Sequence, residues 1–121
     1  MKKILLVEDD PLLIDIYTIK LKEAEFEVLV AEDGEKALRE IENAKPDLVI
    51  LDIVLPHLDG WGVLTTMKKN LAFKNMKVVI LSNLGQQEEI KKGQALGADL
   101  YLIKAHYTPS EVVEKIKELF I

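Results

Sequence analysis

Short apolar runs divide the chain, and each is followed by a polar break before a helix-like segment begins. Four runs are strong, at residues 4–7, 48–51, 78–81 and 100–103, and a weaker one lies at residues 28–31. Apolar and polar residues do not alternate within the runs, which is typical of strands buried on both faces of a parallel sheet. The pattern therefore predicts five buried strands.

The segment after the first run has apolar residues at three- and four-residue steps, as one face of a helix does. Asp10-Pro11 predicts where this helix begins, because aspartate is a favoured N-cap and proline a favoured first residue. The apolar stripe that follows consists of Leu12, Leu13, Ile16, Tyr17, Leu21 and Ala24, with Lys20 as its one polar member.

The last helix has an equally clear start. Thr108-Pro109-Ser110-Glu111 has the form of a capping box. Three further helices are predicted near residues 35–43, 61–69 and 87–96. In the third of these, Glu88 and Lys92 are four residues apart and are expected to pair on the helix surface. The apolar face of the last helix consists of Val112, Val113, Ile116, Leu119 and Phe120.

The alternation of strand and helix, five times over, predicts an α/β fold. Because crossovers between parallel strands are right-handed, this order gives an open parallel sheet with helices on both faces. The length of 121 residues fits one domain, and neither a repeat nor a linker divides the chain. We expect one domain over residues 1–121, with no effector domain after the last helix.

The composition narrows the classes of function. A formal net charge of −5 argues against a nucleic-acid surface, which is normally basic. The absence of cysteine excludes disulfides and thiolate chemistry. No apolar run approaches the roughly 20 residues that span a bilayer. We therefore expect a cytoplasmic protein that binds neither nucleic acid nor membrane.

Polar side chains that can do chemistry follow the apolar runs directly. Glu8 and Asp9 follow the first run, Asp52 the third, Ser82 the fourth and Lys104 the fifth. Ligands of open parallel sheets bind at the carboxyl ends of the strands. If the first and third strands are neighbours, the three carboxylates converge on one edge of the sheet.

Such a cluster of carboxylates requires positive charge. Two carboxylates about 4 Å apart repel each other by roughly 4 kcal/mol at an effective dielectric constant of about 20. Oxygen ligands without histidine or cysteine select a hard cation, and we expect Mg²⁺. Lys104 would add a second positive charge and Ser82 a hydroxyl donor. Together these groups indicate phosphoryl transfer onto an aspartate.

The residues at the strand ends belong to motifs that resemble a known family, the receiver domains of bacterial and archaeal two-component response regulators. The resemblance covers the whole chain, is closest in type to single-domain chemotaxis regulators, and implies a flavodoxin-like three-layer sandwich with strand order 2-1-3-4-5 and five helices. It rests on Ile4-Leu5-Leu6-Val7-Glu8-Asp9-Asp10, Leu51-Asp52-Ile53-Val54-Leu55-Pro56-His57-Leu58-Asp59-Gly60, Leu81-Ser82 and Tyr101-Leu102-Ile103-Lys104.

The resemblance implies a phosphorylation site with a metal ion. Asp52 would be the phosphorylated aspartate. Asp9 and Asp52 would ligate Mg²⁺ directly, the backbone carbonyl of Val54 would complete the protein's share of the ligands, and Glu8 would act mostly through water. No organic cofactor is implied. The chain would catalyse only its own phosphorylation and dephosphorylation, and would not be an enzyme otherwise.

The resemblance also implies a switch. Ser82 would bond a phosphoryl oxygen and move toward it, Lys104 would pair with the phosphate, and Tyr101 would change rotamer between two states. The surface formed by the fourth helix, fifth strand and fifth helix would then change. The implied partners are a sensor histidine kinase or a histidine phosphotransfer protein, and a downstream protein. A phosphorylation-dependent dimer through the same surface is one form that the output could take.

Four positions bear on how this site would differ from others in the family. Ala105 stands where the family usually has proline, so we expect a trans peptide bond or a reshaped loop after Lys104. Asn83 follows Ser82 where a small residue is usual, which could narrow access to the phosphate. Val54 and Leu84 are apolar and are expected to hinder the water that removes the phosphoryl group.

Other classes of function compete with this interpretation. A phosphorylation-independent adaptor would keep the fold, but it would not need the complete set of strand-end residues. A Mg²⁺-dependent phosphohydrolase would need a second acid near the nucleophile, where Val54 stands instead. A nucleotide-binding domain is disfavoured because the first turn is acidic and lacks a glycine-rich loop.

Overall fold

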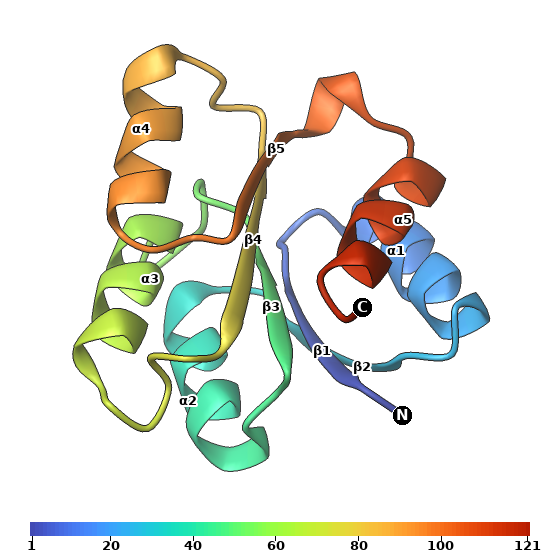
Figure 1. The fold of residues 1–121 in the computed structure, drawn as a ribbon, viewed down its shortest axis with the longest axis horizontal. Helices are drawn as coiled ribbons and strands as arrows, with labels where there is room; N and C mark the ends of the chain where they lie inside the picture. Colours follow the sequence, from blue (N-terminus) through green and yellow to red (C-terminus); the bar gives the residue numbers. More distant parts are fainter.

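The computed structural model describes all residues 1–121, and it shows a parallel sheet between two layers of helices (Figure 1). The five strands lie in the order β2-β1-β3-β4-β5. This confirms the expected flavodoxin-like α/β sandwich. The elements are β1 Lys3–Val7, α1 Pro11–Glu23, β2 Glu27–Ala31, α2 Gly34–Ala44, β3 Leu48–Leu51, α3 Gly60–Lys69, β4 Lys77–Ser82, α4 Gln87–Ala95, β5 Leu100–Ile103, the 3₁₀ turn η1 Lys104–His106 and α5 Pro109–Glu118.

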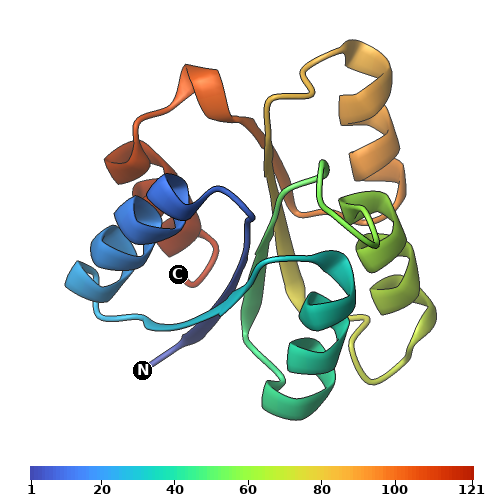
Figure 2. The same ribbon diagram turned by 180° about the vertical axis from the view of Figure 1, so that it is seen from behind.

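The two faces of the sheet are covered by different helices. α1 and α5 lie on one face, and α2, α3 and α4 on the other (Figures 1 and 2). Within β1, Ile4 and Leu6 pack in the core under α1 and α5, whereas Leu5 and Val7 pack in the core under α2 and α3. Both sets are buried, which explains why the central strands read as unbroken apolar runs.

The first helix starts as expected but buries fewer residues than its stripe predicts. Asp10 is the N-cap, and its Oδ1 accepts hydrogen bonds from the backbone N–H groups of Leu12 and Leu13 at 2.9 and 3.4 Å. The prediction that Leu12 belongs to the buried stripe was wrong, because Leu12 is 66% exposed. Leu12 lies five residues before the buried Tyr17, which places it about 140° away around the helix axis.

The last helix has the complete capping box. Thr108 Oγ1 accepts from the N–H of Glu111 at 3.2 Å, and the Glu111 carboxylate accepts from the N–H of Thr108 at 2.8 Å. These bonds lower the pKa of Glu111 below its usual value. They also fix the start of α5, whose Val112, Val113 and Ile116 are buried.

Removing this cap is expected to destabilise the fold. Thr108→Ala should lower the free energy of unfolding by about 1 kcal/mol, because the backbone N–H of Glu111 in the first turn of α5 loses its partner. Urea unfolding followed by circular dichroism measures the loss. Thr108→Ser keeps the hydroxyl and is the matched control; an equal loss in both variants would contradict the capping explanation.

All five strands are parallel, so their carboxyl ends share one edge of the sheet. The chain order reverses at β1, because β2 pairs on one side of it and β3 on the other. Open α/β sheets bind ligands at this position. None of the helices combines the length and the apolar character needed to cross a bilayer.

Candidate phosphorylation site

The core of this protein contains three buried polar or charged residues, and all lie at the carboxyl edge of the sheet. Glu8 is 2%, Asp52 6% and Ser82 1% exposed. Glu8 follows β1, Asp52 follows β3 and Ser82 ends β4. Burying a charged group costs free energy unless it is paired. Their concentration at one edge therefore indicates a functional site.

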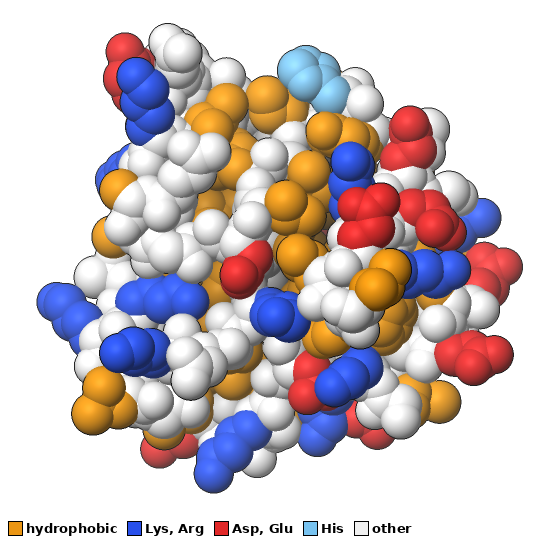
Figure 3. Space-filling model, viewed as in Figure 1, with side chains coloured by type: hydrophobic (Ala, Val, Ile, Leu, Met, Phe, Trp, Pro, Cys, Tyr) orange, Lys and Arg blue, Asp and Glu red, His pale blue; other side chains and the backbone are white.

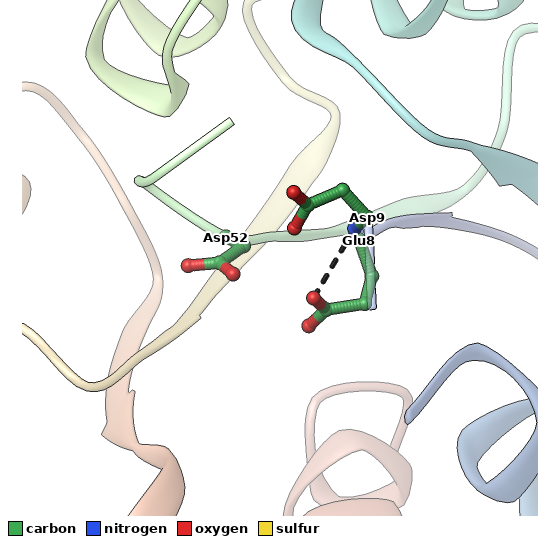
Figure 4. A group of neighbouring side chains, drawn as sticks. All are labelled: Glu8, Asp9 and Asp52. Carbon is green, nitrogen blue, oxygen red and sulfur yellow. Dashed lines mark hydrogen bonds between the residues drawn. The ribbon is translucent and has the colours of Figure 1, made fainter. Parts of the chain in front are cut away.

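Glu8 and Asp52 form an acidic group with Asp9 (Figure 4). One carboxylate oxygen of each residue lies within 4.8 Å of the others. Asp9 is exposed whereas the other two are buried, so the group is open to solvent on the Asp9 side. Carboxylate oxygens at this spacing suit a hard divalent cation such as Mg²⁺. The donor set thus fits the metal expected from the sequence.

Lys104 joins two of these carboxylates. Its Nζ lies 2.7 Å from Glu8 Oε1 and 2.7 Å from Asp52 Oδ2. The Lys104 side chain is 13% exposed, so these ion pairs are largely shielded from water. The chain contains no cis peptide bond, and residues Lys104–His106 form the 3₁₀ turn η1. The peptide bond between Lys104 and Ala105 is therefore trans, as expected, and the Lys104 ammonium group lies in the site.

The remaining oxygens of the buried carboxylates are also hydrogen-bonded. Glu8 Oε2 accepts from the N–H groups of Asp9 and Asp10, each at 3.2 Å, and Figure 4 shows the first of these bonds. Asp52 Oδ1 accepts from the N–H of Ile53 at 2.7 Å. With Lys104 on the other oxygen of each group, both oxygens of Glu8 and both of Asp52 have a partner within the protein.

Burial and charge act in opposite directions on these groups. Burial raises the pKa of Glu8, although the hydrogen bond and charge of Lys104 oppose it. Burial alone would lower the pKa of Lys104, but hydrogen bonds and charges from Asp52 and Glu8 together raise it above its usual value. Lys104 is therefore a permanent cation at neutral pH, held between two acids.

The sequence pattern did not assign Tyr17 of α1 to the site. Tyr17 is 3% exposed and packs in the core under α1 and α5. Burial raises the pKa of its hydroxyl; the charge of Lys104 opposes this and that of Glu8 adds to it. Its phenol is thus within electrostatic range of the site. A tyrosine rather than a phenylalanine in a core stripe was the available signal.

A cavity of about 280 Å³ opens beside Asp52. Asn83 and Leu84 line it, as their position after Ser82 predicts. Val54, which is 64% exposed, lines it as well. Apolar groups thus stand at the rim of a polar site. The complete lining consists of Asp52, Val54, Ser82, Asn83, Leu84 and Lys104.

Ser82 and Tyr101 both hold the backbone of Leu84. Ser82 Oγ accepts from the N–H of Leu84 at 3.3 Å, and the Tyr101 hydroxyl donates to the Leu84 carbonyl. Burial raises the pKa of Tyr101, with smaller contributions from Glu89 and Asp52, so the hydroxyl keeps its proton at neutral pH. The loop between β4 and α4 is therefore hydrogen-bonded to the two residues for which the family resemblance implies a switch role.

The next element, α4, is attached to the core by few groups. Gly93 is its one buried residue, and no side chain caps its start at Gln86. The expected pairing of Glu88 with Lys92 was wrong. Lys92 instead places Nζ 4.5 Å from the centre of the Trp61 ring at the start of α3, because a half-buried aromatic face attracts a nearby cation.

Comparisons with known proteins identify the family of this chain. The family model for the response regulator receiver domain matches residues 4–117, and the chain belongs to that family. The alkaline phosphatase synthesis transcriptional regulatory protein PhoP of Bacillus subtilis (strain 168) is 38% identical over 120 residues, which are 98% of this chain and 48% of that protein. The chain thus spans about half the length of the curated relatives it matches.

Solved structures show the same fold. The receiver domain of Francisella response regulator 1452 has a TM-score of 0.91 and 30% identity, over 99% of this chain and 97% of that one. The Mn²⁺-bound form of response regulator Rcp1 has a TM-score of 0.87 and 27% identity, over 99% and 94% of the two chains. Receiver domains accept phosphoryl groups from histidine kinases and bind Mg²⁺ at an acidic pocket.

Proposed function

We propose that this chain accepts a phosphoryl group on Asp52 from the phosphohistidine of a sensor histidine kinase or a histidine phosphotransfer protein. The observation that carries the proposal is the placement of Asp52. Its carboxylate is buried, lies against the Lys104 ammonium at 2.7 Å, and borders a cavity that Ser82 also lines. A nucleophile, a cation and a hydroxyl donor thus surround one open volume.

The transfer is a displacement at phosphorus. An oxygen of Asp52 forms a bond to the phosphorus while the bond from phosphorus to the donor's imidazole nitrogen breaks, and that nitrogen keeps the electron pair. Lys104 stabilises the negative charge on the phosphoryl oxygens, and the Ser82 hydroxyl donates to one of them. The chain carries out its own phosphorylation and dephosphorylation and is not otherwise an enzyme.

The acidic group supports a role for Mg²⁺. Asp9 and Asp52 would hold the ion directly with the Val54 carbonyl, and Glu8 would act through water. When bound, the ion supplies positive charge that offsets the repulsion between the acids and the incoming phosphoryl group. The similar receiver Rcp1 was solved with Mn²⁺, a cation that also prefers oxygen ligands.

The output is a change in the surface of α4, β5 and α5. If Ser82 turns toward a phosphoryl oxygen, its bond to the Leu84 N–H is lost and the loop can move. The Tyr101 hydroxyl would then give up its bond to the Leu84 carbonyl as Tyr101 changes rotamer. Figure 3 shows hydrophobic side chains gathered between α4 and α5, with charged ones to either side. A downstream protein, or a second copy in a phosphorylation-dependent dimer, would bind there.

Three finer predictions accompany the proposal. With a net charge of −5, residues 1–121 are expected to act through proteins and not through direct contact with nucleic acid. The relative PhoP is named a transcriptional regulatory protein, and this chain covers 48% of it. A single-domain organisation and a cytoplasmic location stay predictions. A phosphorylation-independent adaptor is the alternative, and the intact Asp52–Lys104 contact argues against it.

Intact-mass measurement tests the proposal. The protein is incubated with Mg²⁺ and acetyl phosphate, and a mass gain of one phosphoryl group is expected. Asp52→Ala should show no gain, whereas Asp15→Ala, which removes an exposed acid of α1, should gain as the wild type does. No gain in the wild type, together with no Mg²⁺ binding, would favour the adaptor.

The apolar rim should prolong the phosphorylated state. Val54→Asn is expected to shorten the half-life of the phosphoryl group about tenfold, because an amide in place of an exposed valine can hold and orient the attacking water. The half-life is followed by intact mass after the phosphodonor is removed. Val54→Ile keeps the rim apolar and should leave it unchanged. An unaltered half-life in Val54→Asn would refute this explanation.

A further inference from the structure

The loop that links β3 to α3 carries Asp52 at its start and Val54 beside the cavity. Its path is sharply defined. The N–H of Gly60 donates to the Ile53 carbonyl at 2.8 Å. His57 has a positive φ of 67°, a backbone conformation that residues other than glycine rarely adopt. Such a loop keeps its shape only if its surroundings hold it.

Gly34, the first residue of α2, makes the tightest contact with this loop. A Cβ atom at Gly34 would lie 2.0 Å from the Leu58 carbonyl oxygen, 2.7 Å from the Leu58 carbonyl carbon and 2.8 Å from Leu58 Cβ. Gly34 is helical and has no positive φ, so its backbone conformation suits any residue. Glycine is needed here for space alone.

Leu58 is held from a second side by α3. A Cβ at Gly62 would lie 2.4 Å from Leu58 Cδ1. The Leu58 backbone thus rests on α2 and its side-chain tip on α3, and Leu58 packs against the core under both helices. Two glycines on different helices form a seat for one residue of the loop.

We propose that Gly34 is a positioning residue for the phosphorylation site, and that it acts through the Leu58 backbone. This inference rests on the proposed function, because it concerns how Asp52 and the Val54 carbonyl are aimed. Gly34 touches neither. It lets α2 approach closely enough to fix the far end of the loop, while Gly60 fixes the near end beside Asp52, where a Cβ would lie 2.3 Å from the Asp52 carbonyl oxygen.

The size of the displacement follows from the distances. Cβ atoms in proteins essentially never approach another heavy atom closer than 3.0 Å, so Gly34→Ala must separate α2 from the Leu58 carbonyl by about 1 Å. The α2 helix resists movement, because its Ala37 and Ile41 are fully buried in the core beneath it. The loop is therefore expected to yield. Misplacing a reacting group by about 1 Å can cost about 100-fold in rate.

The test compares Gly34→Ala with two controls. Phosphorylation by acetyl phosphate is measured at saturating Mg²⁺, and Mg²⁺ affinity is measured separately by fluorescence of Trp61, the single tryptophan, which follows the loop directly. We expect Gly34→Ala to be phosphorylated at least tenfold more slowly and to bind Mg²⁺ more weakly. Gly62→Ala meets only the flexible tip of Leu58 and should retain most of the rate.

The second control separates positioning from stability. Ile116→Val lowers stability from α5, on the opposite face of the sheet, and should be phosphorylated at the wild-type rate. A wild-type rate in folded Gly34→Ala would overturn the proposal, as would an equal slowing in Ile116→Val. If Gly34→Ala does not fold, Leu58→Gly decides, because it keeps Gly34 but releases the Leu58 backbone; slower phosphorylation is expected, and an unchanged rate would refute the proposal. If the wild type is not phosphorylated, the proposed function fails, and the Mg²⁺ affinities still test the inference.

Discussion

Lys104→Met is expected to slow phosphorylation of Asp52 by about 100-fold or more, the loss typical of removing one stabilising donor from a transition state. Lys104 is the one ammonium within 4.0 Å of both buried carboxylates, and its own side chain is 13% exposed. Methionine has a similar length and no charge. The phosphoryl oxygens would then lose their cation, while Asp52 itself would remain.

The same substitution should change Mg²⁺ binding in the opposite direction. Without Lys104, Glu8 and Asp52 would lack a counter-charge, so the site should bind Mg²⁺ more tightly than in the wild type. The metal-free variant should also lose about 3–5 kcal/mol of stability, as when one partner of a buried ion pair is removed. Mg²⁺ would restore part of this loss.

Three measurements on Lys104→Met check these expectations: phosphorylation rate by intact mass, Mg²⁺ affinity by Trp61 fluorescence, and urea unfolding with and without Mg²⁺. Lys91→Met, at an exposed lysine of α4, is the matched control and should behave as the wild type does. Weaker Mg²⁺ binding in Lys104→Met would show that the ammonium supports the metal site instead of competing with it.

Asp9→Asn is expected to weaken Mg²⁺ binding about 100-fold and to reduce phosphorylation accordingly, because ligand charge sets much of the affinity for a hard cation. Asp9 is the exposed member of the acidic group, and the other two members are already paired with Lys104. It therefore offers the carboxylate that is most available to an entering ion.

The neighbouring acid supplies an unusually close control. Asp10→Asn removes the same charge one residue away and keeps the helix cap, since asparagine caps as well as aspartate. Its Mg²⁺ affinity should fall only slightly. Titration of both variants with Mg²⁺, followed by fluorescence, separates a ligand from a nearby charge. Equal losses in the two variants would mean that Asp9 acts through the general field alone.

The strands were predictable because each is a short apolar run buried on both faces. β3 and β5 have the predicted bounds, and the others extend by one or two residues. Knowing the strand order was then enough to bring Glu8, Asp9, Asp52, Ser82 and Lys104 together at one edge, where the structure places them. Their chemical roles stay predictions.

Contacts between elements were much harder to foresee. Lys104 was expected to pair with the phosphate, and its contacts with Glu8 and Asp52 in the structure were not foreseen. Lys92 was expected to pair along its own helix and instead contacts Trp61 of α3. The contact between Gly34 and Leu58 could not be predicted from the spacing of apolar and polar residues. These contacts depend on distances between elements that are far apart in the sequence, which local periodicity does not contain.

The weak attachment of α4 has a consequence for cooperativity. With one buried residue and no side-chain cap, α4 should open locally at a lower free energy than the helices that fill the two cores. Its amide hydrogens would then exchange with solvent without global unfolding. A partner that binds α4 could therefore select a conformation that is already populated in the unphosphorylated protein. The sheet that holds Asp52 would stay folded while this happens.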